Sequence, residues 1–173
     1  GDWQGGAELM LAPARKLAEM GADFLICPAN TMHQALPQVL PRSRRPWLHI
    51  ADAVADEAVK RGFKRLGILG TRWLSASDVY RSKFMARGLE PVHPSAAETD
   101  ELHRIIIEEL NCSLFKPEAI VYHQRVIARL KDEGCDAVVL ACTEIPLIIN
   151  DENCALPTLD STRFLARAAP KHS

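Results

Sequence analysis

The thiol of Cys142 is the side chain best suited to acid–base chemistry in this chain. It stands directly before Thr143 and Glu144 in the run GCDAVVLACTEIP of residues 134–146. A cysteine thiolate can take up or return a proton when a helix N-terminus lowers its pKa toward neutrality. A strand over 136–141 should give way to a helix at this point, so the backbone N–H groups of Thr143 and Glu144 are well placed to bind a carboxylate. We therefore predict a catalytic thiol beside an anion-binding turn.

The same segment occurs a second time, with a different residue in place of the thiol. Residues 21–33 read GADFLICPANTMH and align without a gap, which places Asn30 and Thr31 on the polar pair of the other copy and Ala29 on its cysteine. Each copy is expected to form a helix that ends at a glycine, a buried strand and a polar loop. Ligands of open α/β sheets bind beyond the carboxyl ends of the strands, so the two loops should face a shared cleft.

Each of these residues also has a structural explanation. A glycine, an acidic residue and an apolar run are a common way to enter a parallel strand. A buried cysteine often acts as a small hydrophobic residue, and threonine or asparagine can simply cap a helix. A polar pair after both strands favours the functional interpretation.

The elements that must position these residues alternate between helix and strand. Such alternation implies an α/β fold with right-handed crossovers and parallel sheets. We expect helices over 4–20, 31–39, 51–61, 74–87, 99–110, 117–133 and 161–169, and strands over 23–28, 47–50, 66–70, 136–141 and 156–159.

The composition limits the class of protein. The 173 residues are 47% hydrophobic and 25% charged, which is typical of a globular chain large enough for a core. A net charge of −1 gives no support for nucleic-acid or membrane binding, and no apolar run approaches the roughly 20 residues that span a bilayer. The five cysteines are odd in number and lack metal-ligand spacing, which indicates a reduced, cytoplasmic protein without a metal site.

Four motifs together resemble the aspartate/glutamate racemase family, the cofactor-independent amino-acid racemases and their relatives. They are ANTMH at 29–33, LHIAD at 48–52, LGILGTR at 66–72 and ACTEIP at 141–146. The resemblance implies two pseudo-symmetric parallel-sheet α/β domains with the site in the cleft between them. It also implies an amino acid or dicarboxylate as ligand, no cofactor and a homodimer.

The same resemblance suggests how the chain divides. Residues 1–46 would belong to an N-terminal domain completed by residues 158–173, and residues 47–157 would form the second domain. Relatives normally open with an earlier strand, a glycine-rich turn and a helix, and this chain begins at Gly1 with a helix-like stretch. We therefore interpret the sequence as a fragment, truncated at the N-terminus of its first domain.

Racemisation requires a base for the weakly acidic α-proton, donors that neutralise the carboxylate, and a proton donor on the opposite face. The resemblance gives Cys142 the acid–base role, but most relatives carry a second cysteine where this chain has Ala29. Cys27 lies about 6–7 Å deeper on the same side of the strand and is the candidate substitute, although a core position is favoured for it. The substrate-binding positions implied by the resemblance are Asn30, Thr31, Thr71, Thr143 and Glu144.

Other positions depart from the family pattern or are open to two interpretations. A lysine that some relatives use on the side-chain carboxylate falls at Asn111, and a histidine common in the last helix falls at Leu165. Arg72 follows Thr71 but is at least as well explained by solvent exposure. His33 and His49 follow the motifs and could be scaffold residues or acid–base groups.

We expect an amino-acid racemase of the aspartate/glutamate type. A one-thiol lyase similar to the arylmalonate decarboxylases is an alternative, because those enzymes need only one protonating cysteine, at the position of Cys142. A catalytically impaired member that binds an amino or dicarboxylic acid is a second alternative, which Ala29, Asn111 and Leu165 favour.

Overall fold

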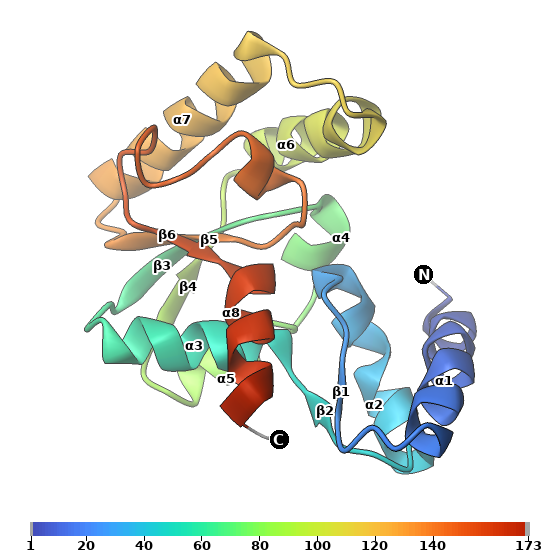
Figure 1. The fold of residues 1–173 in the computed structure, drawn as a ribbon. Coiled ribbons are helices and arrows are strands. Elements are labelled where there is room, and N and C mark those ends of the chain that lie inside the picture. The colour runs from blue at the N-terminus through green and yellow to red at the C-terminus, as the bar shows by residue number, and fades with distance from the viewer. Residues whose placement is uncertain (1, 172–173) are drawn as a thin grey trace.

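A computed structural model describes residues 2–171 and has an α/β architecture built on parallel strands (Figure 1). The helices are α1 Trp3–Glu19, α2 Leu36–Val39, α3 Ile50–Lys60, α4 Arg72–Ser75, α5 Arg81–Met85, α6 Ala96–Glu108, α7 Pro117–Asp132 and α8 Ser161–Ala168. The strands are β1 Leu25–Ile26, β2 Trp47–Leu48, β3 Arg65–Leu69, β4 Glu90–Val92, β5 Ala137–Leu140 and β6 Thr158–Asp160. Short 3₁₀ helices follow β1 (η1, Asn30–Ala35), α2 (η2, Leu40–Arg42), α6 (η3, Leu110–Cys112), β5 (η4, Ile145–Leu147) and α8 (η5, Ala169–Lys171).

The larger sheet is fully parallel, in the order β4-β3-β5-β6. Figure 1 shows α6 and α7 on one face of it and α3, α5 and α8 on the other. Side chains alternate between the faces along a strand. Val138, Leu140 and Cys142 accordingly pack in the core beneath α6 and α7, whereas Val139 and Ala141 pack in the core on the α3 side. Cys142 thus continues the α6/α7 face of β5 beyond the end of the strand.

The smaller sheet consists of β1 and β2, which are parallel and pair Leu25 with Trp47. Helices α1 and α2 cover it around a separate small core that includes Leu11, Leu36 and Val39. The polar loop after β1 leads from this unit toward the larger one through η1, which contacts α4.

The sequence repeat is a structural repeat. Gly21 after α1 and Gly134 after α7 both have positive φ, 94° and 88°, which favours glycine. In both copies the residue after the glycine donates its N–H to a carbonyl five residues back, Ala22 to Leu17 and Cys135 to Leu130. This is the Schellman ending of a helix, so the same local sequence reverses the chain into β1 and β5 in the same way.

Three expectations differ from the structure. Residues 47–48 pair with β1 and residues 158–160 pair with β5, so the divisions expected at 46/47 and 157/158 would each separate a strand from its partner. Helix α8, which was expected to complete the N-terminal domain as part of residues 158–173, packs instead against α3 on the larger sheet. Residues 172 and 173 of this segment lie outside the described residues. The pairing of short strands depends on contacts distant in sequence, which local periodicity does not contain.

The third difference is the helix expected over 74–87, which is two short helices joined by a turn. The hydroxyl of Ser77 donates to the carbonyl of Leu74 at 2.6 Å and accepts from the N–H of Val79 at 3.4 Å. Serine side chains that bond nearby backbone groups compete with helix continuation. The turn lets Val79 and Tyr80 enter the core on the α3 side of the larger sheet.

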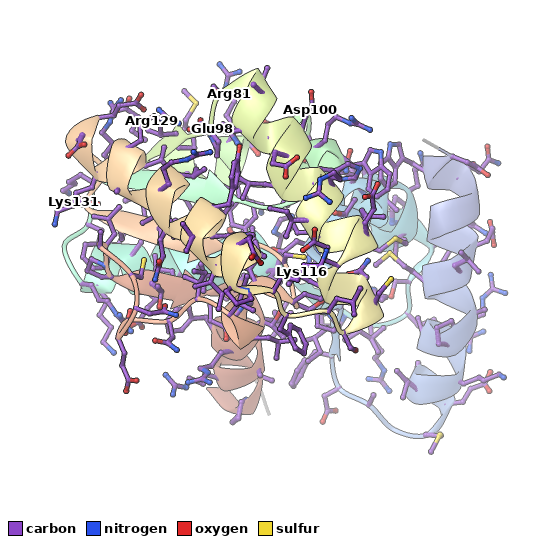
Figure 2. All side chains as sticks on the ribbon, turned by 90° about the horizontal axis from the view of Figure 1, so that it is seen from above. Arg81, Glu98, Asp100, Lys116, Arg129 and Lys131 are labelled. Atoms are coloured by element: carbon purple, nitrogen blue, oxygen red, sulfur yellow. The ribbon has the colours of Figure 1, made fainter. Side chains whose placement is uncertain are left out.

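Ion pairs tie α6 to α7 on the outer surface. Figure 2 shows Arg129 of α7 beside Glu98 of α6; their guanidinium and carboxylate groups are joined by two hydrogen bonds, of 2.7 and 2.6 Å. Glu98 also accepts from the N–H of Ser95 at 2.9 Å, as the second half of a capping box. Within the described part of the chain, no helix is both long and apolar enough to cross a bilayer.

His123 is a fully buried histidine of α7 with one unsatisfied ring nitrogen. Its Nδ1 lies 2.7 Å from the carbonyl oxygen of Ala119, so Nδ1 carries the proton, and Nε2 is buried with no partner among the described residues. Burial lowers the pKa of His123 below its usual value. The neutral form is therefore favoured in the folded state, and the corresponding stability is lost as the pH falls from about 6.5 toward the folded pKa.

We expect His123→Leu to stabilise the fold, by about 1–2 kcal/mol, because it removes an orphaned polar atom and a group that must stay neutral. The gain in the free energy of unfolding should be larger at about pH 5 than at about pH 7.5, because the parent loses stability as the pH falls. Urea unfolding of the parent and the variant at both pH values measures this. A variant that is less stable than the parent by the same amount at both pH values would show that the packing of the imidazole ring, and not its polarity, determines the contribution of His123 to stability.

Candidate active site

A pocket of about 230 Å³ lies beyond the carboxyl ends of β1, β3 and β5. Seven of its lining residues are the ones singled out from sequence: Ala29, Asn30, Thr31, Thr71, Cys142, Thr143 and Glu144. The lining is completed by Trp73, Ile106, Ile107, Asn111 and Ala141. The structure thus brings the three predicted strand-end loops together in one place.

The pairing of β3 with β5 explains why Thr71 and Cys142 are neighbours. The two parallel strands are in register from Leu66 and Ala137 onward, and the N–H of Ala141 extends the ladder by donating to Leu69 O at 2.8 Å. Gly70 then passes close to this backbone: a Cβ at this position would lie 3.1 Å from the Ala141 carbonyl oxygen and 2.9 Å from Leu74 Cδ2. A side chain at this position would crowd the Ala141 carbonyl, so glycine favours the close approach of the two strand ends.

The Cys142 thiol is largely buried and is held in its protonated form. The residue is 9% exposed, and Sγ donates to Glu144 Oε2 at 2.9 Å. Burial and this carboxylate raise the pKa of Cys142 to about 12, against smaller lowering contributions from the N–H groups of Glu144 and Ile145. The expectation of a pKa near neutrality for Cys142 is therefore not met. The helix expected from residue 143 is the three-residue η4, too short for a strong dipole.

Glu144 holds the motif together through its side chain. Its second carboxylate oxygen, Oε1, accepts from the Thr143 hydroxyl at 2.6 Å. The two preceding residues of the ACTE run thus both donate to the same carboxylate. This geometry places the carboxylate of Glu144 beside the Cys142 thiol, which the sequence argument, based on backbone N–H groups, did not anticipate.

Asn30 lies at the centre of a buried hydrogen-bond chain that joins the two units. Tyr80 donates its hydroxyl to Asn30 Oδ1 at 2.5 Å, and Asn30 Nδ2 donates to the Ser161 hydroxyl at 3.0 Å. Ser161 in turn donates to the carbonyl of Leu140 at 2.9 Å. The loop after β1 is thereby fixed to the end of β5. Tyr80 and Ser161 were missed from sequence, because no local motif marks them and Ser161 is 131 residues away from Asn30.

The threonine hydroxyls of the two units meet in the pocket. Thr31 Oγ1 lies 3.3 Å from Thr71 Oγ1, and Thr71 Oγ1 also accepts from the N–H of Leu74 as the N-cap of α4. Because the capping bond uses an acceptor lone pair, the Thr71 proton stays available for a ligand or for Thr31.

Four other residues considered from sequence do not line the pocket. Cys27 packs against the small core of α1 and α2, and burial raises the pKa of its thiol. His33 accepts the N–H of Ile50 on Nε2 at 3.1 Å and bonds the carbonyl of Ala29 through Nδ1 at 3.2 Å. The remaining two are His49, which caps α3, and Arg72, which pairs with Asp100 on the surface.

Both histidines are scaffold residues. Burial lowers the pKa of His33, and burial together with the neighbouring His33 lowers that of His49 to about 4. Their hydrogen bonds to backbone N–H groups require an unprotonated ring nitrogen. Leu165 is likewise buried in the core, whereas Asn111 does line the pocket.

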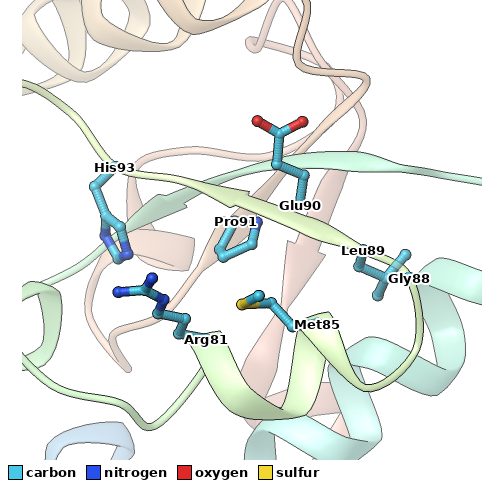
Figure 3. A pocket seen from close by; sticks show the side chains of 7 residues that line it. All are labelled: Arg81, Met85, Gly88, Leu89, Glu90, Pro91 and His93. Carbon is cyan, nitrogen blue, oxygen red and sulfur yellow. The ribbon is translucent and has the colours of Figure 1, made fainter.

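A larger cavity, of about 530 Å³, lies at the edge strand β4 (Figure 3). Arg81 and His93 point toward each other across it, and the rest of its lining includes Met85, Leu89 and Pro91. It contains no thiol and none of the strand-end loops. The smaller pocket is the better candidate for the active site, because chemistry in parallel α/β sheets occurs at the carboxyl ends of the strands.

The fold and the pocket define a parallel α/β protein with a single thiol among the described residues that line a strand-end pocket. The sequence matches the profile of the Asp/Glu/hydantoin racemase family over residues 1–169, and the chain belongs to this family. Its fold, including the arrangement in two α/β units, agrees with that of the Asp/Glu racemases.

Individual relatives support this assignment. A protein from Yersinia pestis assigned as an Asp/Glu racemase has a crystal structure that is 32% identical, with a TM-score of 0.90, over 99% of this chain and 75% of that one. An aspartate racemase homologue from Pyrococcus horikoshii OT3 is also 32% identical, with a TM-score of 0.85, over 98% and 75%. The broad specificity amino-acid racemase RacX from Bacillus subtilis (strain 168) is 24% identical over 158 residues, which are 90% of this chain and 66% of RacX.

Proposed function

We propose that this protein acts on amino acids as a racemase of the aspartate/glutamate type, exchanging the α-proton through Cys142 without a cofactor. The observation that carries the proposal is the convergence of the Cys142 thiol with hydroxyl and amide donors from two other strand ends in one pocket. A carbanion next to a carboxylate needs this combination of an acid–base group and anion-stabilising donors.

The roles follow from the chemistry of the lining. The Thr31 and Thr71 hydroxyls and the N–H groups of the Cys142–Glu144 turn would hold the α-carboxylate. Glu144 would face the α-ammonium group, whose positive charge would offset the carboxylate that now raises the pKa of Cys142. Substrate binding would thereby favour the thiolate that the reaction needs.

Ala29 limits what the site can do. It lines the same pocket as Cys142, at the position equivalent to Cys142 in the repeat, and a methyl group has no proton to give. We therefore infer that proton exchange occurs mainly on one face of the substrate and that complete inversion is slow.

Solvent deuterium incorporation tests the proposal. The protein should introduce deuterium at Cα of an amino acid in deuterium oxide faster than it inverts the configuration, as measured by mass spectrometry and chiral chromatography on the same samples. Absence of exchange for every amino acid, with the ligand shown to bind, would contradict the proposal.

A one-thiol lyase is the second candidate, and the protonated state of Cys142 favours it. In such a reaction a substituted malonate would lose one carboxyl group as carbon dioxide, and the carbanion left behind would take the Cys142 proton. The resulting thiolate would regain a proton from water. Release of carbon dioxide from a malonate would distinguish this function, and binding of amino or dicarboxylic acids without either reaction would indicate an impaired member.

We expect Glu144→Gln to lower the pKa of Cys142, because it removes the carboxylate that accepts from the thiol and repels the thiolate. Alkylation of Cys142 by iodoacetamide near neutral pH should become about tenfold faster, since one pKa unit changes the thiolate fraction tenfold. Peptide mass spectrometry across a pH series measures it.

Glu152→Gln is the matched control for this experiment, because Glu152 is exposed and outside the pocket. An unchanged alkylation rate at Cys142 in the Glu144 variant would show that burial alone sets the pKa.

We further propose a cytoplasmic homodimer as the working form of this protein.

A further inference from the structure

We propose that this pocket selects amino acids that carry no second carboxylate, above all those with aliphatic side chains. The inference rests on the proposed function only for the statement that the ligand is an amino acid. It follows from the charges and surfaces of the lining residues, which differ from what a dicarboxylic amino acid would require.

The pocket lacks a cation for a side-chain carboxylate. No lysine, arginine or histidine belongs to its described lining, and the one carboxylate there is Glu144. A buried carboxylate without a positive partner is strongly unfavourable, and a like charge nearby adds to the cost. Aspartate or glutamate would place its second negative charge in this environment.

The arginines of α4 and α6, the two helices that contribute to the lining, are paired elsewhere. Arg72 of α4 pairs with Asp100 at 3.0 Å on the surface. Arg104 of α6 bonds Glu101 at 2.7 Å and the buried Glu109 at 2.9 Å. Turning Arg72 or Arg104 into the pocket would break these pairs. Loss of the Arg104 pair would also remove a positive charge from beside the buried carboxylate of Glu109.

One wall of the pocket is apolar. Ile106 and Ile107 of α6 and the indole of Trp73 on α4 form it, with Asn111 at the end of the helix. Trp73 is held by an edge contact with the ring of His103, with 4.6 Å between the ring centroids. An aliphatic side chain would remove its own surface and that of Trp73 and Ile107 from water, which favours binding in proportion to the apolar area buried.

The size of the pocket fits one small ligand. Its volume of about 230 Å³ lies below the roughly 300–1,000 Å³ of pockets that hold drug-sized molecules. The Cys142 thiol and the Thr143 hydroxyl bond Glu144, which would serve the amino-acid head, and the apolar wall is left for the side chain. Leucine and methionine are therefore suitable probes.

Equilibrium binding tests the inference independently of catalysis. Leucine and methionine, in both configurations, should bind the full chain at least about tenfold more tightly than aspartate and glutamate, as measured by calorimetry. Tighter binding of either acidic amino acid, or no binding of the aliphatic ones, would overturn the inference. Leucine binding without deuterium exchange would leave the inference standing and contradict only the proposed function.

Asn111→Lys should reverse the preference, because it introduces a cation into the lining. Aspartate binding should strengthen about tenfold or more, and leucine binding should weaken or stay unchanged. Gln38→Lys is the matched control, since it adds the same charge at an exposed position of α2 outside the pocket. If both lysine variants strengthen aspartate binding equally, net charge rather than the pocket determines it, and the inference fails.

Discussion

Cys142→Ala is expected to abolish α-proton exchange, lowering its rate by about 10²–10⁴, the contribution of a positioned acid–base group. Of the described residues that line the pocket, Cys142 is the one with a thiol, and no histidine or lysine lies there to replace it. The measurement is deuterium incorporation at Cα, followed by mass spectrometry with leucine and with aspartate.

Cys27→Ala is the matched control for this loss. Cys27 is a partly buried thiol that packs against the α1/α2 core and does not line the pocket. Its removal should leave most of the exchange in place. Exchange at the parent rate in the Cys142 variant would show that another group removes the proton, and loss of exchange in both variants would point to a general effect on folding, which circular dichroism would reveal.

The architecture could be predicted from sequence because its determinants are local. Glycines at positive φ, at 21 and 134, end the helices that precede β1 and β5, and the following apolar runs have the length of buried parallel strands. Parallel strands place their carboxyl ends at one edge of a sheet, so the polar residues after β3 and β5, which lie in one sheet, had to be on the same side. The loop after β1 belongs to the smaller sheet, and it meets the other two through tertiary contacts such as those of Asn30 with Tyr80 and Ser161. The catalytic and binding roles of these residues remain predictions.

The features that sequence did not reveal depend on tertiary contacts. Tyr80 reaches Asn30 across 50 residues, from a turn that local periodicity identified as helix. The pKa of Cys142 depends on burial beneath α6 and α7 and on the rotamer of Glu144, two residues away. A motif can place a thiol at a strand end, but whether the thiolate is stabilised there depends on what the rest of the chain packs around it.

The pairing of the short strands illustrates the same limit. β2 and β6 contain two and three residues, and each could be assigned to either sheet from its sequence. Their pairing goes with the packing of the neighbouring helices. Helix α8 follows β6 directly and packs on α3, and β6 pairs with β5 at the edge of the larger sheet. Strand identity was thus predictable, and strand partnership was not.

Ala29→Cys is expected to convert a site that exchanges protons on one face into one that inverts configuration. Ala29 and Cys142 occupy equivalent positions in the repeat and line the same pocket, so the substitution supplies a second thiol. Inversion of an enantiopure amino acid should accelerate by about 10²–10⁴ relative to the parent, whereas exchange without inversion should change less. Polarimetry under reducing conditions, which prevent a disulfide between the two thiols, measures it.

The double variant Ala29→Cys with Cys142→Ala separates the two faces, because it should exchange the proton only on the face opposite to that used by the parent. Unchanged inversion in the single variant, with the new thiol shown by alkylation to be accessible from the pocket, would mean that the two strand ends do not approach the substrate from opposite sides.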